Sequence, residues 1–299
     1  MDRVLREAVE SMLAARDGAA AAIVADRAVS GGCIHDSRLV ELADGRTLFL
    51  KADRDAAGDL FEREAEGLAA LAAAGAVRVP RDPLPGRAGG TAFLLMEAIP
   101  TGRPGTGFWE DFGRRFARLH RGTANRGDGG RAGFARDNYL GGTPQPNPWS
   151  ADWVDFVRRH RLGHQLCLAR ANGRSTPGLD RLGDRLLERL DDLLNAADEP
   201  FCLLHGDLWS GNFLTDDHGA PVLIDPAAYY GHREADLAMT SLFGGFDGRF
   251  YDAYAEEWPL PHGTARRQEI YQLYHLLNHL NLFGGGYLEG CLRTLRRYA

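Results

Sequence analysis

The chain reads HGDLWSGN from His205 to Asn212, and a further carboxylate, Asp225, follows the next apolar strand. Phosphoryl transfer needs an acceptor for the proton of the attacking group, ligands for a metal ion, and positive charge beside the phosphates. The D-x-x-x-x-N spacing predicts Asp207 as the proton acceptor and Asn212 as a metal ligand. Asp225 is expected to bind the same metal, magnesium, and Pro226 predicts an extended backbone for it. The stretch therefore indicates a phosphotransferase, with His205 ordering the loop by hydrogen bonds.

A lysine in the N-terminal part of the chain is expected to supply the positive charge beside the phosphates. Lys51 is the only lysine among 35 basic residues, and it ends a strand predicted at 47–51. A compact ammonium binds phosphate differently from a guanidinium fork, so a single lysine indicates a specific role. Glu64 falls on the apolar face of a helix predicted at Leu60–Ala74. We expect Lys51 to hold the phosphates of ATP and Glu64 to hold Lys51.

A glycine pair, Gly31-Gly32, lies between strands predicted at 23–29 and 37–42. Backbone N–H groups in such a loop can bind phosphate, although two glycines between strands also form ordinary hairpins. We expect Gly31, Gly32 and Cys33 to contact ATP. Backbone N–H groups beside an exposed Cys33 thiol would lower its pKa, which predicts oxidation and a disulfide between two copies of the chain. A small residue packed under the loop is an equal alternative.

The remaining pattern predicts an α+β, two-lobed, protein-kinase-like fold. Residues 91–99 read as a strand after a Gly/Pro-rich loop at 81–90. Three residues near the end of this strand are expected to offer backbone contacts to adenine: Met96, Glu97 and Ala98. We expect a small β-sheet lobe with one main helix at 1–97, and a larger, mostly helical lobe at 98–299. Helices are predicted in the large lobe at 109–120, 153–168, 179–194 and 269–283, with short strands at 201–204, 213–215 and 221–225 and a functional surface loop at 122–148.

The composition excludes several classes of protein. The 299 residues carry a formal net charge of -6 without any basic tract, which disfavours a nucleic-acid partner. The apolar stretches are far shorter than the ~20 residues of a membrane-spanning helix. Four cysteines, with no C-x-x-C pair, disfavour both a zinc site and a disulfide framework. We therefore expect a cytoplasmic protein whose partner is a small molecule or a modified amine, of unknown oligomeric state.

The run DPAAYYGHREADLAM from Asp225 to Met239, taken with LHGDLWSGN from Leu204, resembles the fructosamine kinase family, also called ketosamine-3-kinases. The resemblance covers nearly the whole chain through four further motifs: FLK at 49–51, FERE at 61–64, NYLG at 138–141 and LYHLLNH at 273–279. The related aminoglycoside phosphotransferases share the shorter H-G-D-x-x-x-x-N pattern. They lack, as a rule, Trp209 and the YYGHRE run.

The resemblance implies ATP-dependent phosphorylation of the 3-hydroxyl of a ketosamine, after which the product can eliminate phosphate and free the amine. The ketosamine is expected on a small molecule or on a glycated protein amine. A sugar that bears an amine suits aromatic faces and carboxylates. Five residues are therefore expected to contact the substrate: Trp209, Tyr229, His232, Glu234 and Asp236. Core packing is an equal alternative for the tyrosines.

Two other functions remain open from the sequence. One is a kinase for a different small hydroxylated amine, such as an aminoglycoside or choline. The other is a nucleotide-binding scaffold without catalysis, which predicts loss of at least one of Lys51, Asp207, Asn212 and Asp225, whereas all four are present. His275 and His279 are four residues apart on an apolar helix, but no intervening glutamate makes them a zinc motif, and we expect core or pocket residues.

Overall fold

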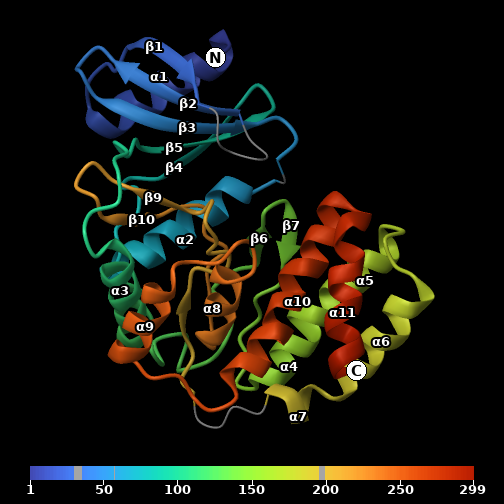
Figure 1. The fold of residues 1–299 in the computed structure, drawn as a ribbon. Coiled ribbons are helices and arrows are strands. Elements are labelled where there is room, and N and C mark those ends of the chain that lie inside the picture. The colour runs from blue at the N-terminus through green and yellow to red at the C-terminus, as the bar shows by residue number, and fades with distance from the viewer. Residues whose placement is uncertain (30–35, 57, 195–198) are drawn as a thin grey trace.

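The computed structural model has two lobes, a small one built on a five-stranded sheet and a larger, mostly helical one (Figure 1). It describes residues 1–29, 36–56, 58–194 and 199–299. The elements of the small lobe are α1 (Arg3–Asp17), β1 (Ile23–Ala28), β2 (Asp36–Leu42), β3 (Thr47–Asp53), α2 (Leu60–Ala74), β4 (Leu84–Ala88) and β5 (Thr91–Glu97). The fold class predicted from the sequence is confirmed. The division into 1–97 and 98–299 stays a proposal.

The sheet of the small lobe is antiparallel throughout, in the order β1-β2-β3-β5-β4. Successive side chains of a strand point to opposite faces. Along β5, Phe93 and Leu95 pack in the apolar cluster that contains α1, whereas Leu94 and Met96 pack in the cluster that contains α2. The two helices therefore cover opposite faces. Lys51 of β3 pairs with Leu94, which places Lys51 on the face of α2.

The large lobe is assembled from helices around a few very short strands (Figure 1). Its helical elements are α3 (Phe108–Thr123), α4 (Trp153–Val157), the π-helical turn η1 (Arg158–Leu162), α5 (Gly163–Ala171), α6 (Pro177–Glu188), α7 (Leu190–Leu194), α8 (Glu234–Thr240), α9 (Gly248–Glu257), α10 (Thr264–Phe283), the 3-10 turn η2 (Gly285–Tyr287) and α11 (Leu288–Tyr298). Its strands form three two-stranded sheets: β6 (Asn138–Leu140) with β7 (Thr143–Gln145), β8 (Cys202–Leu204) with β11 (Tyr229–Gly231), and β9 (Phe213–Thr215) with β10 (Pro221–Leu223).

These short sheets bring the two chemically important stretches together. The stretch from His205 to Asn212, called the catalytic stretch below, connects β8 to β9. The segment around Asp225 connects β10 to β11. Because β9 pairs with β10 and β8 pairs with β11, the two connections start and end side by side. The backbone N–H of Ile224 also donates to the carbonyl of Asn212 at 3.1 Å.

Five parts of the fold differ from the prediction. The small lobe has two helices of 15 residues, α1 and α2, where one main helix was expected. The segment 81–90, which was expected to be a loop, contains β4. No strand was predicted because Pro85 and Gly86 interrupt most strands. However, β4 lies at the edge of the sheet, where proline is tolerated. The expected surface loop at 122–148 contains β6 and β7, with Asn138 and Gln145 buried. The helix expected at 153–168 includes the π-helical turn η1, and the one at 179–194 is divided into α6 and α7.

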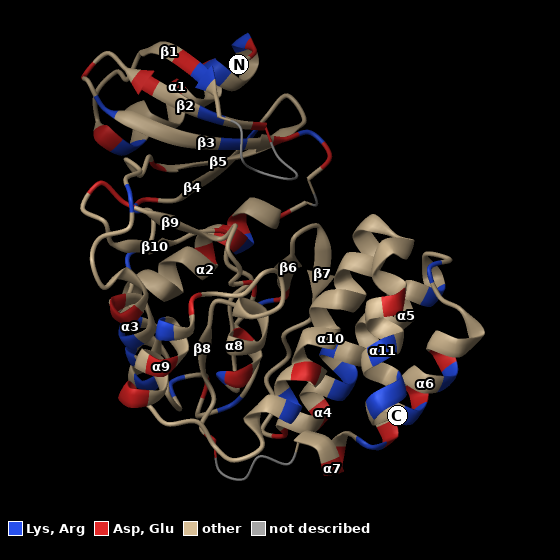
Figure 2. Cartoon of the chain, in the orientation of Figure 1, with Lys and Arg blue, Asp and Glu red and all other residues tan. Residues whose placement is uncertain are grey.

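Charged segments of both signs lie interspersed along α3, α6 and α9 in this view (Figure 2). Many form ion pairs, such as Arg115 with Asp111 within α3 and Arg170 of α5 with Asp180 of α6. Each such exposed pair stabilises the fold only slightly. In the parts of the chain that the structure describes, no helix is both long and apolar enough to span a bilayer.

Candidate active site

Lys51 lies between two carboxylates, one from each lobe. Its Nζ donates to Glu64 Oε1 of α2 at 2.7 Å and to Asp225 Oδ1 at 2.5 Å. The lysine side chain is only 6% exposed. Burial alone would lower the pKa of Lys51, but the charges of Asp225 and Glu64 outweigh it and raise the pKa. The ion pair predicted between Lys51 and Glu64 is confirmed, and Lys51 stays charged at neutral pH.

Asp207 and Asn212 form the second half of the site. The Asn212 side-chain amide donates to the backbone oxygen of Asp207 at 2.8 Å and to its Oδ2 at 3.1 Å. The amide oxygen of Asn212 therefore faces away from Asp207. Burial raises the pKa of Asp207 well above its usual range, the charge of Asp225 raises it further, and the bond from Asn212 opposes both effects. A carboxylate with a raised pKa is a stronger base than an ordinary one, which suits proton acceptance.

Asp225 does not have the extended backbone that Pro226 predicts. Its φ is +56°, in the left-handed region that side chains other than glycine rarely adopt. Asp tolerates this region better than most residues, and such conformations gather at functional sites. The expectation was wrong because the local preference of a residue before proline is overridden by contacts on both sides: Ile224 bonds to Asn212, and Ala227 donates to the carbonyl of His205 at 2.9 Å.

The donor set at this site fits magnesium. Asn212 and Asp225 offer an amide oxygen and a carboxylate, and the Asp225 side chain is 40% exposed. Magnesium prefers oxygen ligands and is usually held by one or two carboxylates together with substrate phosphates. Among the described residues, no group of three or more His, Cys, Asp or Glu side chains is placed to hold a metal alone. The site is thus suited to a metal that arrives with a nucleotide.

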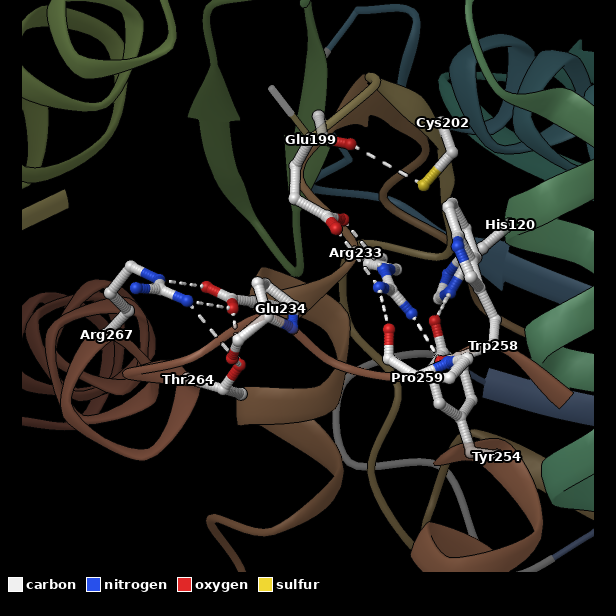
Figure 3. A network of polar contacts seen from close by, with 12 residues as sticks. His120, Glu199, Cys202, Arg233, Glu234, Tyr254, Trp258, Pro259, Thr264 and Arg267 are labelled. Carbon is white, nitrogen blue, oxygen red and sulfur yellow. Dashed lines mark hydrogen bonds and ion pairs between the residues drawn. The ribbon is translucent and has the colours of Figure 1, made fainter. Parts of the chain in front are cut away.

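Asp236 of α8 anchors the backbone of the catalytic stretch by accepting two hydrogen bonds from it. Asp236 Oδ2 accepts from the N–H of His205 at 2.7 Å, and its Oδ1 accepts from the N–H of Gly206 at 2.8 Å. His120 of α3 also contacts Asp236 Oδ2 at 3.2 Å. The other ring nitrogen of His120 bonds to the hydroxyl of Tyr254 at 2.8 Å (Figure 3). All of these groups are buried. Asp236 therefore orders the catalytic loop, which is a positioning role.

His205 and Gly206 explain why the loop has this sequence. His205 Nδ1 accepts from the N–H of Asp207 at 3.2 Å, so the ring proton lies on Nε2, which donates to the carbonyl of Ile224 at 2.9 Å. The expected ordering of the loop by His205 is confirmed. Gly206 has φ +83°, and a Cβ there would lie 2.1 Å from the carbonyl oxygen of Ala227. Only glycine allows the two connections to approach this closely.

Four of the five expected substrate contacts lie in buried positions. Glu234 is 1% exposed and its two oxygens are bound by Arg267 and Thr264, each at 2.6 Å (Figure 3). Asp236 is occupied as described above. The His232 ring packs between Trp153 and Phe201.

Tyr229 also packs in the core: it is 4% exposed, and the Arg161 guanidinium lies 4.0 Å from its ring centre. The packing alternative fits Tyr229 better than a substrate contact. The same geometry gives His232, Glu234 and Asp236 structural roles. The substrate contacts of these four residues stay predictions from the sequence.

Trp209 is the expected substrate contact that remains accessible. Its ring is half-buried and folds back over Gly211, where a Cβ would come within 2.4 Å of the ring. Phe243 meets Trp209 edge-on at 6.4 Å, and the ring of His279 lies 4.6 Å from Phe243. Tyr287 follows at 5.0 Å from His279. An aromatic row, consisting of Trp209, Phe243, His279 and Tyr287, therefore extends from the catalytic loop.

The segment from Met96 to Ala98 connects the lobes and lines a cavity of about 530 Å³. Four arginines of the small lobe also line this cavity: Arg16, Arg46, Arg78 and Arg81. Arg78 bridges the lobes because it donates to Glu97 and to Asp216 at 2.8 Å each. Lys51, Asp207, Asn212 and Asp225 are not among the lining residues. The expected adenine contacts of Met96, Glu97 and Ala98 stay a prediction.

Three expected ATP contacts, Gly31, Gly32 and Cys33, lie outside the described residues. The predicted phosphate loop and the disulfide-linked dimer through Cys33 remain predictions from the sequence. The cysteines that the structure describes, Cys167, Cys202 and Cys291, are free.

The sequence did not reveal the polar network under the segment 225–228. Asn138 donates to the carbonyl of Ala228 at 2.8 Å, and Gln145 donates to the carbonyl of Ala227 at 3.1 Å. The Tyr274 hydroxyl donates to Gln145 at 2.8 Å, which connects the network to α10. The NYLG motif was visible in the sequence, but its partners lie about 90 residues further along the chain. The network fixes the backbone that follows Asp225.

Known proteins resemble this chain along most of its length. A model described as "Fructosamine kinase" matches residues 5–299. A protein named "Probable ketoamine kinase" from Synechocystis sp. is 41% identical, over 91% of this chain and 89% of that protein. The chloroplastic protein-ribulosamine 3-kinase of Oryza sativa subsp. japonica is 40% identical, over 94% of this chain and 81% of the relative.

Solved structures agree with the sequence matches. A protein from Haemophilus somnus that was solved as a fructosamine-3-kinase candidate superposes with a TM-score of 0.86 at 28% identity, covering 98% of this chain and 97% of that one. An aminoglycoside phosphotransferase in complex with ADP and hygromycin B has a TM-score of 0.64 at 16% identity, covering 96% and 98%, which shows the fold alone. The chain belongs to the fructosamine kinase family.

Proposed function

We propose that this chain transfers the terminal phosphoryl group of ATP to the 3-hydroxyl of ketosamines. The observation that supports this most is the joint placement of Lys51, Glu64, Asp207, Asn212 and Asp225 around one point between the lobes. The family relatives named as ketoamine and ribulosamine kinases indicate the acceptor. The substrate class includes fructosamines, ribulosamines and erythrulosamines, on small amines or on glycated proteins.

In this proposal Asp207 accepts the proton of the sugar hydroxyl while the hydroxyl oxygen attacks the phosphorus, and ADP leaves. The bond from Asn212 to Asp207 Oδ2 fixes the carboxylate and leaves Oδ1 for the hydroxyl. Asn212 and Asp225 hold magnesium, which neutralises phosphate charge when it is bound. Lys51 remains attached to Glu64 while a phosphate replaces Asp225 as its second anionic partner. Met96, Glu97 and Ala98 offer the backbone contacts to adenine.

Trp209 supplies an aromatic face to the acceptor beside Asp207. The aromatic row that extends from it suits the apolar part of an amine or a peptide side chain. A reducing compartment such as the cytoplasm fits the three cysteines that the structure describes as free, Cys167, Cys202 and Cys291. Neither the role of Trp209 nor the compartment changes the chemistry at Asp207.

The experiment is an ADP-release assay with ribulosamine, erythrulosamine and fructosamine forms of one amine, followed by phosphorus NMR of the product. We expect a phosphate ester on the third carbon and slow release of inorganic phosphate with free amine. A phosphate on a terminal hydroxyl, without amine release, would contradict the proposal. An aminoglycoside or choline phosphorylated in preference to all three sugars would also contradict it.

Two variants test the roles within the site. Asp207→Asn should reduce turnover by a factor of ~10² to 10⁴ and leave ATP affinity nearly unchanged, because a proton acceptor contributes to rate rather than to nucleotide binding. Asp225→Ala should abolish magnesium-dependent ATP binding as well as activity. If a magnesium titration of ATP binding is the same for Asp225→Ala and wild type, Asp225 does not hold the metal.

A further inference from the structure

His275 of α10 points a polar atom at the catalytic carboxylate without bonding to it. Its Nδ1 lies 3.8 Å from Asp207 Oδ1, beyond hydrogen-bond distance. The histidine is 4% exposed. Within the described part of the chain, Nδ1 of His275 is a buried atom with no hydrogen-bond partner. Buried polar atoms are nearly always paired, so an orphan beside a catalytic group requires an explanation.

The His275 ring is enclosed by neighbouring groups. The Tyr274 ring meets it edge-on at 5.2 Å, and the hydroxyl of Tyr274 is itself held by Gln145. The carbonyl of His275 is bonded to the ring of His279 at 2.9 Å, one turn further along α10. Burial lowers the pKa of His275 to about 3, so the ring is neutral at physiological pH. A proton on Nδ1 is favoured there because that nitrogen faces the carboxylate of Asp207.

His275 Nδ1 and Asp207 Oδ1 lie side by side, 3.8 Å apart. An acceptor that places a hydroxyl on Oδ1 and an oxygen of the adjacent carbon on Nδ1 would give both atoms a hydrogen-bond partner. In the open-chain form of a ketosamine the 3-hydroxyl has two neighbouring oxygens, the carbonyl oxygen on the second carbon and the hydroxyl on the fourth. The carbonyl oxygen accepts hydrogen bonds only, which makes it the better match for a neutral N–H donor.

We propose that His275 Nδ1–H donates to the C2 oxygen of the acceptor while Asp207 binds the 3-hydroxyl, so that His275 selects ketosamines over acceptors without this oxygen. The inference rests on the proposed function and makes it more specific. His275 contributes to substrate recognition, whereas the proton transfer belongs to Asp207. A site that donates to a substrate oxygen discriminates against an analogue that lacks it because the analogue cannot form that hydrogen bond.

The test compares two acceptors and three variants. The acceptors are a ribulosamine and its analogue without the C2 oxygen, which keeps the 3-hydroxyl; the analogue is assayed as substrate and as competitive inhibitor. His275→Leu removes the donor, and His275→Asn retains an amide nitrogen near the position of Nδ1. His164→Gln is the control, because it replaces a half-buried histidine of α5 whose ring bonds to the carbonyl of Pro144.

We expect His275→Leu to lower kcat/KM for the ribulosamine by about tenfold, as loss of one hydrogen bond predicts, with KM for ATP unchanged. The 2-deoxy analogue should bind wild type and His275→Leu equally. His275→Asn should recover most of the loss, and His164→Gln should behave as wild type. Thermal unfolding of each variant shows whether it folds.

An equal loss for both acceptors, or a change confined to KM for ATP, would overturn the inference while the proposed function stands. A folded His275→Asn that is as impaired as His275→Leu would overturn it too, because the retained donor should help. A wild-type enzyme that phosphorylates no ketosamine would overturn the proposed function, and this inference with it.

Discussion

Replacement of His232 by phenylalanine should make the protein less sensitive to mild acid. The His232 ring lies 4.9 Å from the ring of Trp153 and 5.2 Å from that of Phe201, and it is 5% exposed. Burial, reinforced by the charge of Arg267, lowers its pKa to about 3 in the folded state. In the unfolded chain a histidine titrates near ~6.5. Between these values only the unfolded state binds the proton.

The sign and size of the effect follow from this difference. Stability from His232 is fully present above the unfolded pKa and is lost as the pH falls below it, because protonation then favours the unfolded state. Between pH 7 and pH 5 the loss from this one residue is about 2 kcal/mol, at 1.36 kcal/mol per unit of pKa difference. Buried carboxylates with lowered pKa values lose their contribution only at lower pH. The raised pKa of Asp207 acts in the opposite direction, but it is common to wild type and variant and cancels between them.

The assay is urea denaturation of wild type and His232→Phe at pH 7 and pH 5. Wild type should lose about 2 kcal/mol more than the variant over this interval. His218→Phe is the control, since the His218 side chain is 83% exposed and solvated in both states. Equal acid losses in wild type and His232→Phe would refute the reasoning. A raised KM for ketosamine in a stable His232→Phe would instead support the substrate contact expected from the sequence.

Three further changes test the site. Lys51→Arg should lower kcat/KM by about 100-fold despite the retained charge, because a planar fork cannot replace an ammonium held by Glu64; steady-state kinetics that match wild type would make the lone lysine an accident of composition. Asp236→Asn should cost about 2–3 kcal/mol in urea denaturation and lower kcat more than it affects KM for ATP, since an amide N–H then faces the N–H of Gly206; unchanged stability would contradict the anchoring role. Arg78→Met should raise KM for ATP by about fivefold with little change in kcat, because the bridge between the lobes is lost; an altered kcat alone would argue against it.

The sequence predicted the parts of the site in which the chemistry requires particular residue types a few positions apart in the chain. Asp207 and Asn212 are five residues apart, so one motif contains both. Lys51 and Glu64 belong to adjacent elements, and the helical period alone places Glu64 on the buried face. The predicted strands and α2 were found for the same reason, because their patterns are local.

The parts that the sequence did not reveal depend on contacts between distant segments. His120 meets Asp236 across 116 residues, and Glu234 meets Arg267 across 33. No local pattern separates a carboxylate that will meet such a partner from one that will not. The left-handed backbone of Asp225 is similar, because contacts from Asn212 and His205 override what Pro226 favours locally.

Four carboxylates in and around the candidate active site differ in how many of their hydrogen-bonding positions are already occupied. This difference distinguishes the structural carboxylates from the reactive ones. Glu234 and Asp236 are 1% exposed, and the oxygens of each accept bonds from fixed donors. A ligand could reach these buried groups only by displacing a fixed donor or the packing around it, so their removal would mainly disturb the fold. Asp207 and Asp225 differ: Asp207 Oδ1 faces an unbonded histidine nitrogen, and Asp225 is partly exposed and bound by a lysine that has a second partner. Binding of a hydroxyl or a metal by these two costs few existing contacts, so they are the carboxylates on which the chemistry can depend.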